Sequence, residues 1–193
     1  MLRTRIATVL CSLAGGALAL AAVRPALVQE HAEVPTQEHR MLQKGAGDYE
    51  GTITMFMPGM DATPMPATET VEPFGAFWTT VSFESEFMDT PYHGRGTVGY
   101  SANKGKFVGT WYDGMSSHLS YMEGDYDEAS GKLIMRWEAP DMMGVTKPHR
   151  SERVETENGY TMTFFIGDGE GTKSMEIAMK RTGARPAEAS HGH

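Results

Sequence analysis

Apolar and polar residues alternate in short stretches along most of the chain, from Asp48 to Arg181. Successive side chains of a β-strand point to opposite faces, so this alternation is typical of strands with one dry and one wet face. The stretch 77–88 shows it most clearly, with one face carrying Phe77, Val81, Phe83 and Phe87 and the other carrying Trp78, Thr80, Glu84 and Glu86. The pattern predicts a sheet that buries one face.

Ten such stretches follow one another with hairpin-length gaps. The expected strands are Tyr49–Met57, Thr68–Pro73, Phe77–Met88, Gly94–Tyr100, Lys106–Tyr112, His118–Tyr126, Lys132–Glu138, Lys147–Glu155, Tyr160–Ile166 and Ser174–Arg181. Turn signals such as Asp113-Gly114 and Asn158-Gly159 fill the gaps, and no helix-length amphipathic stretch lies between the strands. An antiparallel meander loses its exposed edges when it closes on itself. We therefore expect an all-β fold: a closed or nearly closed antiparallel up-and-down β-barrel of about ten strands, wide enough for a small ligand.

One short helix is expected before the barrel. Thr36 can cap a helix over Gln37–Lys44, which Gly45 and Gly47 would end. The polar residues 29–36 are expected to form a linker, and the barrel domain to span 37–182. Residues 183–193 lack periodicity and are expected to be disordered.

The first 28 residues have the order of a secretory signal peptide. Arg3 and Arg5 precede an apolar run over Ile6–Val23, whose far end is rich in alanine. Because two adjacent arginines are missing, the general secretory route is indicated, which predicts a periplasmic or secreted protein. The run is also near the minimum length of a membrane span, so an uncleaved N-terminal anchor is the alternative. Both interpretations export the barrel.

Charge and cysteine content exclude several classes of protein. The formal charge is −8, from 17 Lys+Arg against 25 Asp+Glu. Nucleic-acid binding is not expected, because it needs clustered Lys and Arg, and no membrane contact is expected after signal cleavage. The single cysteine, Cys11, lies in the apolar run, which excludes a disulfide framework and paired-cysteine metal sites.

Three blocks of sequence carry a resemblance to a known family. They are Gly75-Ala76-Phe77-Trp78, Gly94-Arg95-Gly96-Thr97-Val98-Gly99-Tyr100 and Gly109-Thr110-Trp111-Tyr112-Asp113-Gly114-Met115. Together with Gly131-Lys132-Leu133, they resemble the bacterial domain-of-unknown-function family one-five-seven-nine over nearly the whole exported chain. That family is grouped with the calycin barrels, which include lipocalins, fatty-acid-binding proteins and nitrobindins. The resemblance thus implies a barrel and no particular activity. Where calycins often have Gly-x-Trp on the first strand, this chain has Gly47-Asp48-Tyr49, so that end of the barrel is expected to pack differently.

No motif of a known enzyme class is present in the sequence. The nucleophile elbow, the zinc-protease helix, the phosphate-binding loop and the dinucleotide fingerprint are all missing, so no catalytic residue is assigned. Glu84 and Glu86 have a spacing that could suit glycoside hydrolysis, although a solvated strand face explains them better. An enzyme of another type would need at least two ionisable groups that converge in the barrel with shifted pKa values.

The sequence favours non-enzymatic binding of a small apolar or amphipathic ligand inside the barrel. Ligand pockets combine aromatic side chains with a few polar groups that orient the ligand. An inward Arg95 would bind a carboxylate, with Gly94 and Gly96 leaving space; alternatively, these glycines bend the strand and Arg95 pairs with a surface acid. The candidate ligand-binding residues are Trp78, Arg95, Trp111, Asp113 and His118.

No cofactor is expected for such binding, and copper or haem handling is the alternative. Met60 and Met65 lie in a proline-rich segment, and thioethers select Cu(I). Core packing explains the neighbouring Met55 and Met57 better, because methionine fills irregular gaps. His149 is the candidate haem ligand, since the resemblance to nitrobindin-like barrels implies a ligand on a late strand.

Overall fold

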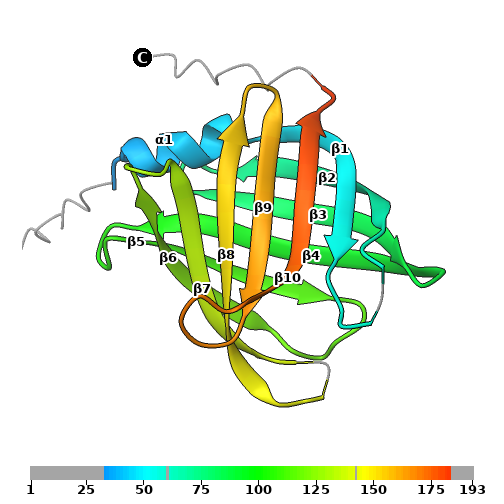
Figure 1. Ribbon diagram of the computed structural model, residues 1–193. Helices are drawn as coiled ribbons and strands as arrows, with labels where there is room; N and C mark the ends of the chain where they lie inside the picture. Colours follow the sequence, from blue (N-terminus) through cyan, green and yellow to red (C-terminus); the bar gives the residue numbers. More distant parts are fainter. Residues whose placement is uncertain (1–32, 60, 142, 184–193) are drawn as a thin grey trace, which may run out of the picture. The chain divides into compact units, whose positions relative to one another are not determined.

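Ten antiparallel strands close into a barrel in which each strand pairs with its neighbours in the chain (Figure 1). The structure is a computed structural model that describes residues 33–59, 61–141 and 143–183. The last strand, β10, pairs with the first, β1, from Tyr49 opposite Arg181 to Met55 opposite Met175. The predicted up-and-down barrel is confirmed.

The expected elements match the observed ones closely. The observed elements are α1 (Gln37–Lys44), β1 (Gly47–Met55), β2 (Pro64–Phe74), β3 (Trp78–Phe87), β4 (Thr90–Ser101), β5 (Lys106–Asp113), β6 (Ser120–Asp127), β7 (Lys132–Pro140), β8 (Thr146–Thr156), β9 (Gly159–Ile166) and β10 (Thr172–Arg181). The largest differences are at the starts of β2 and β4, which begin at Pro64 and Thr90, four residues before the expected Thr68 and Gly94. Proline has no N–H for a sheet ladder, so it suggested a loop; Pro64 and Pro66 instead precede Ala67, where pairing with β3 begins.

The helix α1 is fastened to the barrel by His39, which is buried. The backbone N–H of Thr36, the helix N-cap, donates to His39 Nδ1 over 3.0 Å. Nε2 of the same ring lies 2.9 Å from the carbonyl oxygen of Tyr100 on β4. The ring also meets Phe77 and Tyr100 edge to face. The helix therefore covers one end of the barrel, beside the start of β3 and the end of β4.

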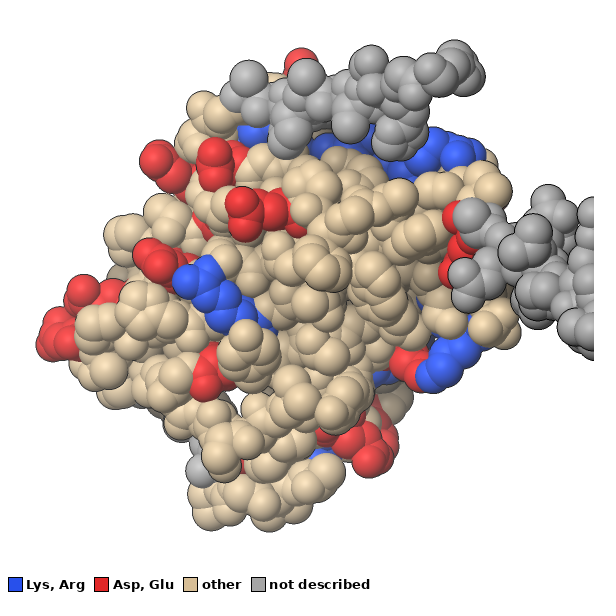
Figure 2. Space-filling view, turned by 180° about the vertical axis from the view of Figure 1, so that it is seen from behind, with Lys and Arg blue, Asp and Glu red and all other residues tan. Residues whose placement is uncertain are grey.

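Alternate residues of the strands point into the barrel, and those of β1, β2, β3, β9 and β10 form a hydrophobic core. Its buried members are Tyr49, Ile53, Ala67, Val71, Phe83, Tyr160, Ile177 and Met179. The residues between them face outward and are mostly polar. Glu84 and Glu86 are exposed on this outer face, as a solvated strand surface requires. Figure 2 shows one side of the outer surface, with Asp and Glu towards its margins and a broad uncharged area between them.

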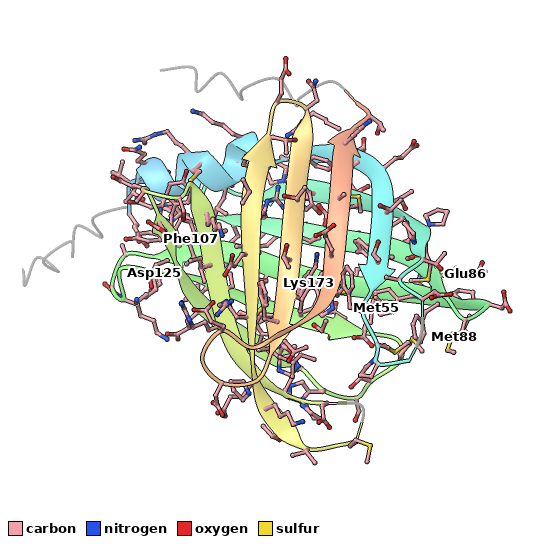
Figure 3. The ribbon with its side chains drawn as sticks, in the orientation of Figure 1. Met55, Glu86, Met88, Phe107, Asp125 and Lys173 are labelled. Carbon is pink, nitrogen blue, oxygen red and sulfur yellow. The ribbon has the colours of Figure 1, made fainter. Side chains whose placement is uncertain are left out.

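The two ends of the barrel differ, and we call them the helix end and the far end. The helix end carries α1 and the loops that enter β3, β5, β7 and β9. The far end carries the loop residues 56–59, 61–63, 88–89, 114–119, 141, 143–145 and 167–171. In Figure 3, Phe107 lies near α1, whereas Met55, Lys173 and Met88 lie away from it.

The predicted signal peptide (1–28), most of the linker (29–36) and nearly all of the C-terminal tail (183–193) lie outside the described residues, so those assignments stay predictions. Within the described residues, no helix has both the length and the apolar character needed to cross a membrane.

Candidate functional site

Aromatic and sulfur-containing side chains line the inside of the barrel at the far end. Six of them pack against the core and are only partly buried. Trp137 on β7 joins them, with its ring 6.2 Å from that of Phe164 on β9. We call this set the far-end wall; it consists of Met55, Met65, Tyr92, Trp111, Trp137, His149, Phe164 and Met175.

Trp111 occupies its place in the wall because the facing strand has no side chains there. Gly94 and Gly96 on β4 lie beneath the indole, and a Cβ on Gly94 would be 2.1 Å from Trp111 Cζ2. The indole Nε1 donates to the Tyr92 hydroxyl over 3.2 Å. Because Gly94 and Gly96 have no side chains, the indole lies against the β4 backbone, and a larger residue at either position would displace it.

Two polar groups are linked to this tryptophan by hydrogen bonds, and a third lies in the loop after β5. The Tyr92 hydroxyl donates to Asp113 Oδ2 over 3.5 Å. Burial, chiefly, and the neighbouring Asp113 raise the pKa of Tyr92 to about 12, so the hydroxyl keeps its proton. His118 precedes β6, and its Nε2 is buried without a hydrogen-bond partner among the described residues. Three of the expected ligand-binding residues, Trp111, Asp113 and His118, thus lie on β5 and the loop that follows it.

The other two expected residues lie on the outer face of the barrel. Arg95 is exposed and lines a shallow polar groove with Thr68, Thr70, Glu72, Ser82 and Glu84. The expectation that Arg95 points inward is therefore wrong, because the Trp111 ring covers the inner side of Gly94 and Gly96. Trp78 covers Gly99 from outside and is 38% exposed.

The structure describes two of the three metal candidates. Met65 lies within β2, opposite Ile53, and not in a loop, so that expectation is wrong. His149 stacks on Trp137 at 5.5 Å, and its Nδ1 lies 2.9 Å from the carbonyl oxygen of Lys147. Met60 lies outside the described residues. Within the described parts of the chain, no three His, Cys, Asp or Glu side chains are grouped as metal ligands would be.

A second set of inward polar residues, which the sequence analysis missed, lies towards the helix end. Glu69 on β2 and Tyr160 on β9 are 5% and 1% exposed. The Arg153 guanidinium lies 3.6 Å from the centre of the Tyr160 ring, and its Nε donates to Glu155 Oε1 over 2.7 Å. We call Glu69, Arg153 and Tyr160 the inner polar cluster. A signal was available for Glu69, because it alternates with Ala67 and Val71 on the buried face.

Burial dominates the electrostatics of the inner polar cluster. It raises the pKa of Glu69, against the opposing effects of the Arg153 charge and the Tyr160 hydroxyl. Burial, with the nearby Glu69 charge, also holds the pKa of Tyr160 well above its ordinary value. For Arg153, burial alone would lower the pKa, but Tyr160, Glu155 and Glu69 together raise it. Three ionisable groups with raised pKa values therefore lie together inside the barrel.

The sequence over residues 34–181 matches a family model described as a protein of unknown function, DUF1579. The chain belongs to the DUF1579 family. A search of curated proteins found none that matches it. In this DUF1579 protein the blocks that carry the family resemblance contact each other, since Trp78 of the first block covers Gly99 of the second, and Trp111 of the third covers Gly94 and Gly96.

Proposed function

We propose that this protein binds a small apolar or amphipathic ligand inside the barrel, through the far end, without chemical conversion. The observation that carries the proposal is the far-end wall itself. Aromatic and thioether side chains are what apolar ligand pockets present, and a few polar groups among them fix orientation. Tyr92, Asp113 and His118 are such groups.

The loops of the far end support entry at this side. Five large hydrophobic side chains are exposed on these loops: Met88, Met115, Leu119, Met143 and Val145. Exposed apolar groups that cluster around one opening are typical of a binding surface. Figure 3 places Met88 at the tip of the β3–β4 hairpin, away from α1.

The expected calycin grouping and the expected export of the chain agree with the same proposal. The barrel is compatible with the calycin grouping, whose members hold ligands in this way. We also propose that the protein acts in the periplasm or outside the cell, on the signal-like residues 1–28.

Native mass spectrometry of the purified protein, followed by titration with the fluorescent apolar probe N-phenylnaphthylamine, tests the proposal. We expect co-purified ligand mass or saturable probe binding. A Trp137→Leu variant should weaken probe binding by about tenfold, because it removes an aromatic wall residue. Trp78→Leu is the matched control on the outer face. A clean apo mass with no probe uptake, or equal losses in both variants, would contradict the proposal.

Cu(I) binding is the second candidate function, and one arrangement favours it. Met55 and Met175 are directly opposed on β1 and β10, and Met65 points inward from β2. Three thioethers thus come from adjacent strands, and Cu(I) prefers such soft ligands. Anaerobic Cu(I) titration should show one site that Met65→Leu and Met175→Leu abolish and Met41→Leu on α1 preserves. No saturable uptake, or uptake that these wall variants leave intact, would remove this candidate.

A further inference from the structure

The inner polar cluster contains two buried polar atoms that lack a hydrogen-bond partner among the described residues. They are Glu69 Oε1 and the hydroxyl oxygen of Tyr160. Leaving a buried polar atom unpaired is costly, so native structures pair such atoms with protein, ordered water or a ligand. The Tyr160 hydroxyl is near enough to Glu69 to lower its pKa, so one group that both donates and accepts would complete the pairing of both atoms.

The cluster spans the inside of the barrel. Glu69 lies on β2, where its register partners are Tyr49 on β1 and Phe83 on β3. Tyr160 and Arg153 come from β9 and β8, which pair with neither β1 nor β3. The charge of Arg153 nevertheless reaches Glu69 and lowers its pKa against the larger effect of burial. Side chains from separate parts of the sheet therefore meet towards the helix end, deep to the far-end wall.

We propose that the inner polar cluster binds the polar end of the ligand, and that this end is a neutral hydroxyl group. The inference rests on the proposed function, because the ligand's apolar body would lie along the far-end wall. The matching ligand class is a long-chain or polycyclic alcohol.

The chemistry of the cluster favours a neutral group over a charged one. Arg153 already donates to Glu155, so its charge is paired. The raised pKa of Glu69 favours a protonated carboxyl, which both donates and accepts hydrogen bonds, as the Tyr160 hydroxyl does. An alcohol donates and accepts in the same way and satisfies both atoms. A carboxylate has no donor and would add negative charge beside Glu69, and an ammonium has no acceptor for the hydroxyl hydrogens of Glu69 and Tyr160.

A set of ligands with the same chain and different ends tests the inference. Decanol, decanoate and decylammonium are compared at neutral pH by their displacement of N-phenylnaphthylamine from the purified protein. We expect decanol to bind at least about tenfold more tightly than either ion, since burying a charge without a partner is strongly unfavourable. Equal affinities for the three, or a preference for either ion, would overturn the inference.

Two shape-conserving variants test whether Glu69 and Tyr160 cause the preference for decanol over the two ions. Glu69→Gln and Tyr160→Phe should reduce the preference for decanol to about threefold or less, because each removes one hydrogen-bonding group. The affinity for the probe itself should stay within about twofold, since the far-end wall is unchanged. Glu72→Gln on the outer face of β2 and Tyr112→Phe on the outer face of β5 are the matched controls.

The outcomes separate the two proposals. If wild-type protein does not bind the probe, the proposed function fails and the inference fails with it. If the probe binds but Glu69→Gln and Tyr160→Phe keep the full preference for decanol, only the inference fails. In that case the two buried atoms pair with each other or with ordered water, not with the ligand.

Discussion

Two tryptophans lie on glycines of the same strand, one on the inner face of the barrel and one on its outer face. Trp111 lies on Gly94 and Gly96 within the barrel, and Trp78 lies on Gly99 from outside. All three glycines belong to β4, and none has room for a methyl group. The same strand therefore supports one ring of the proposed ligand wall and one ring that has no part in it.

This arrangement predicts different effects for two otherwise similar substitutions. Gly94→Ala places a Cβ 2.1 Å from the Trp111 ring, and Gly99→Ala places one 2.3 Å from the Trp78 ring. Each should lower the free energy of unfolding by about 1–3 kcal/mol, as overpacking does. Only Gly94→Ala should weaken probe binding. Urea unfolding and probe titration of both variants check this, and a binding loss in Gly99→Ala would show that the wall is assigned to the wrong side.

Glu69 predicts a dependence of stability on pH. Burial raises its folded pKa above the usual 4.5, so the unfolded chain releases this proton first as the pH rises. The folded state then holds more protons than the unfolded state, and stability falls by about 1.4 kcal/mol per pH unit until the folded pKa is passed. Glu69→Gln should remove this contribution. The free energy of unfolding, measured with urea at several pH values above 4.5, should fall for the wild type relative to the variant as the pH rises. Equal pH dependence of the two proteins would contradict the buried position of Glu69.

At the scale of elements, strand alternation and turn residues were sufficient to predict ten strands and one helix. The orientation of individual residues was harder. Arg95 alternates with glycines, whose lack of a side chain does not indicate which face of β4 is buried. The glycine face is the inner one because the Trp111 ring, from the neighbouring strand β5, lies on it. Glu69 could have been placed from Ala67 and Val71, but its meeting with Arg153 and Tyr160 depends on barrel closure, which no local pattern contains.

Helix α1 depends on one buried residue, which makes its docking testable. His39 is bonded to the N-cap backbone and to Tyr100. His39→Ala should lower the free energy of unfolding by about 2–4 kcal/mol, because it removes a buried ring and leaves the Tyr100 carbonyl without its partner. The backbone amides of α1 should then lose protection from hydrogen exchange. Gln37→Ala, at an exposed position of the same helix, is the control. Hydrogen exchange measures both variants, and an unchanged α1 in His39→Ala would show that the helix is held by other contacts.

The β3–β4 hairpin turns through two residues with strained backbones. Met88 and Asp89 have φ of 50° and 60°, where asparagine and glycine are favoured. Replacing Met88-Asp89 by Asn-Gly should therefore stabilise the protein by about 1 kcal/mol. Met88 is also 66% exposed at the far end, so the same change should slow probe association. Stopped-flow fluorescence and urea unfolding measure the two effects; a destabilised variant would contradict the turn assignment.

The part of the chain that the structure describes from Val34 onward forms a closed barrel with two unlike ends. The helix end is covered by α1 and is tied together by Arg181, whose guanidinium donates to the backbone of Lys44 and Ala46 and to the Tyr49 hydroxyl. The far end carries exposed apolar loops and the aromatic and thioether wall. Binding by this DUF1579 protein should therefore proceed along one axis, from the far end towards the inner polar cluster.

The methionine methyl groups can locate the bound ligand, because they lie inside the barrel, on its far-end loops and on α1. Met55, Met65 and Met175 face the interior at the far end, Met143 is exposed on a far-end loop, and Met41 lies on α1. NMR spectra of the protein with labelled methionine methyl groups, recorded during titration with decanol, are the most direct measurement. The interior methyl signals should shift and show contacts to the ligand chain, while Met41 stays unchanged. Shifts confined to exposed methyl groups such as Met143, or no shifts at saturating decanol, would contradict binding inside the barrel.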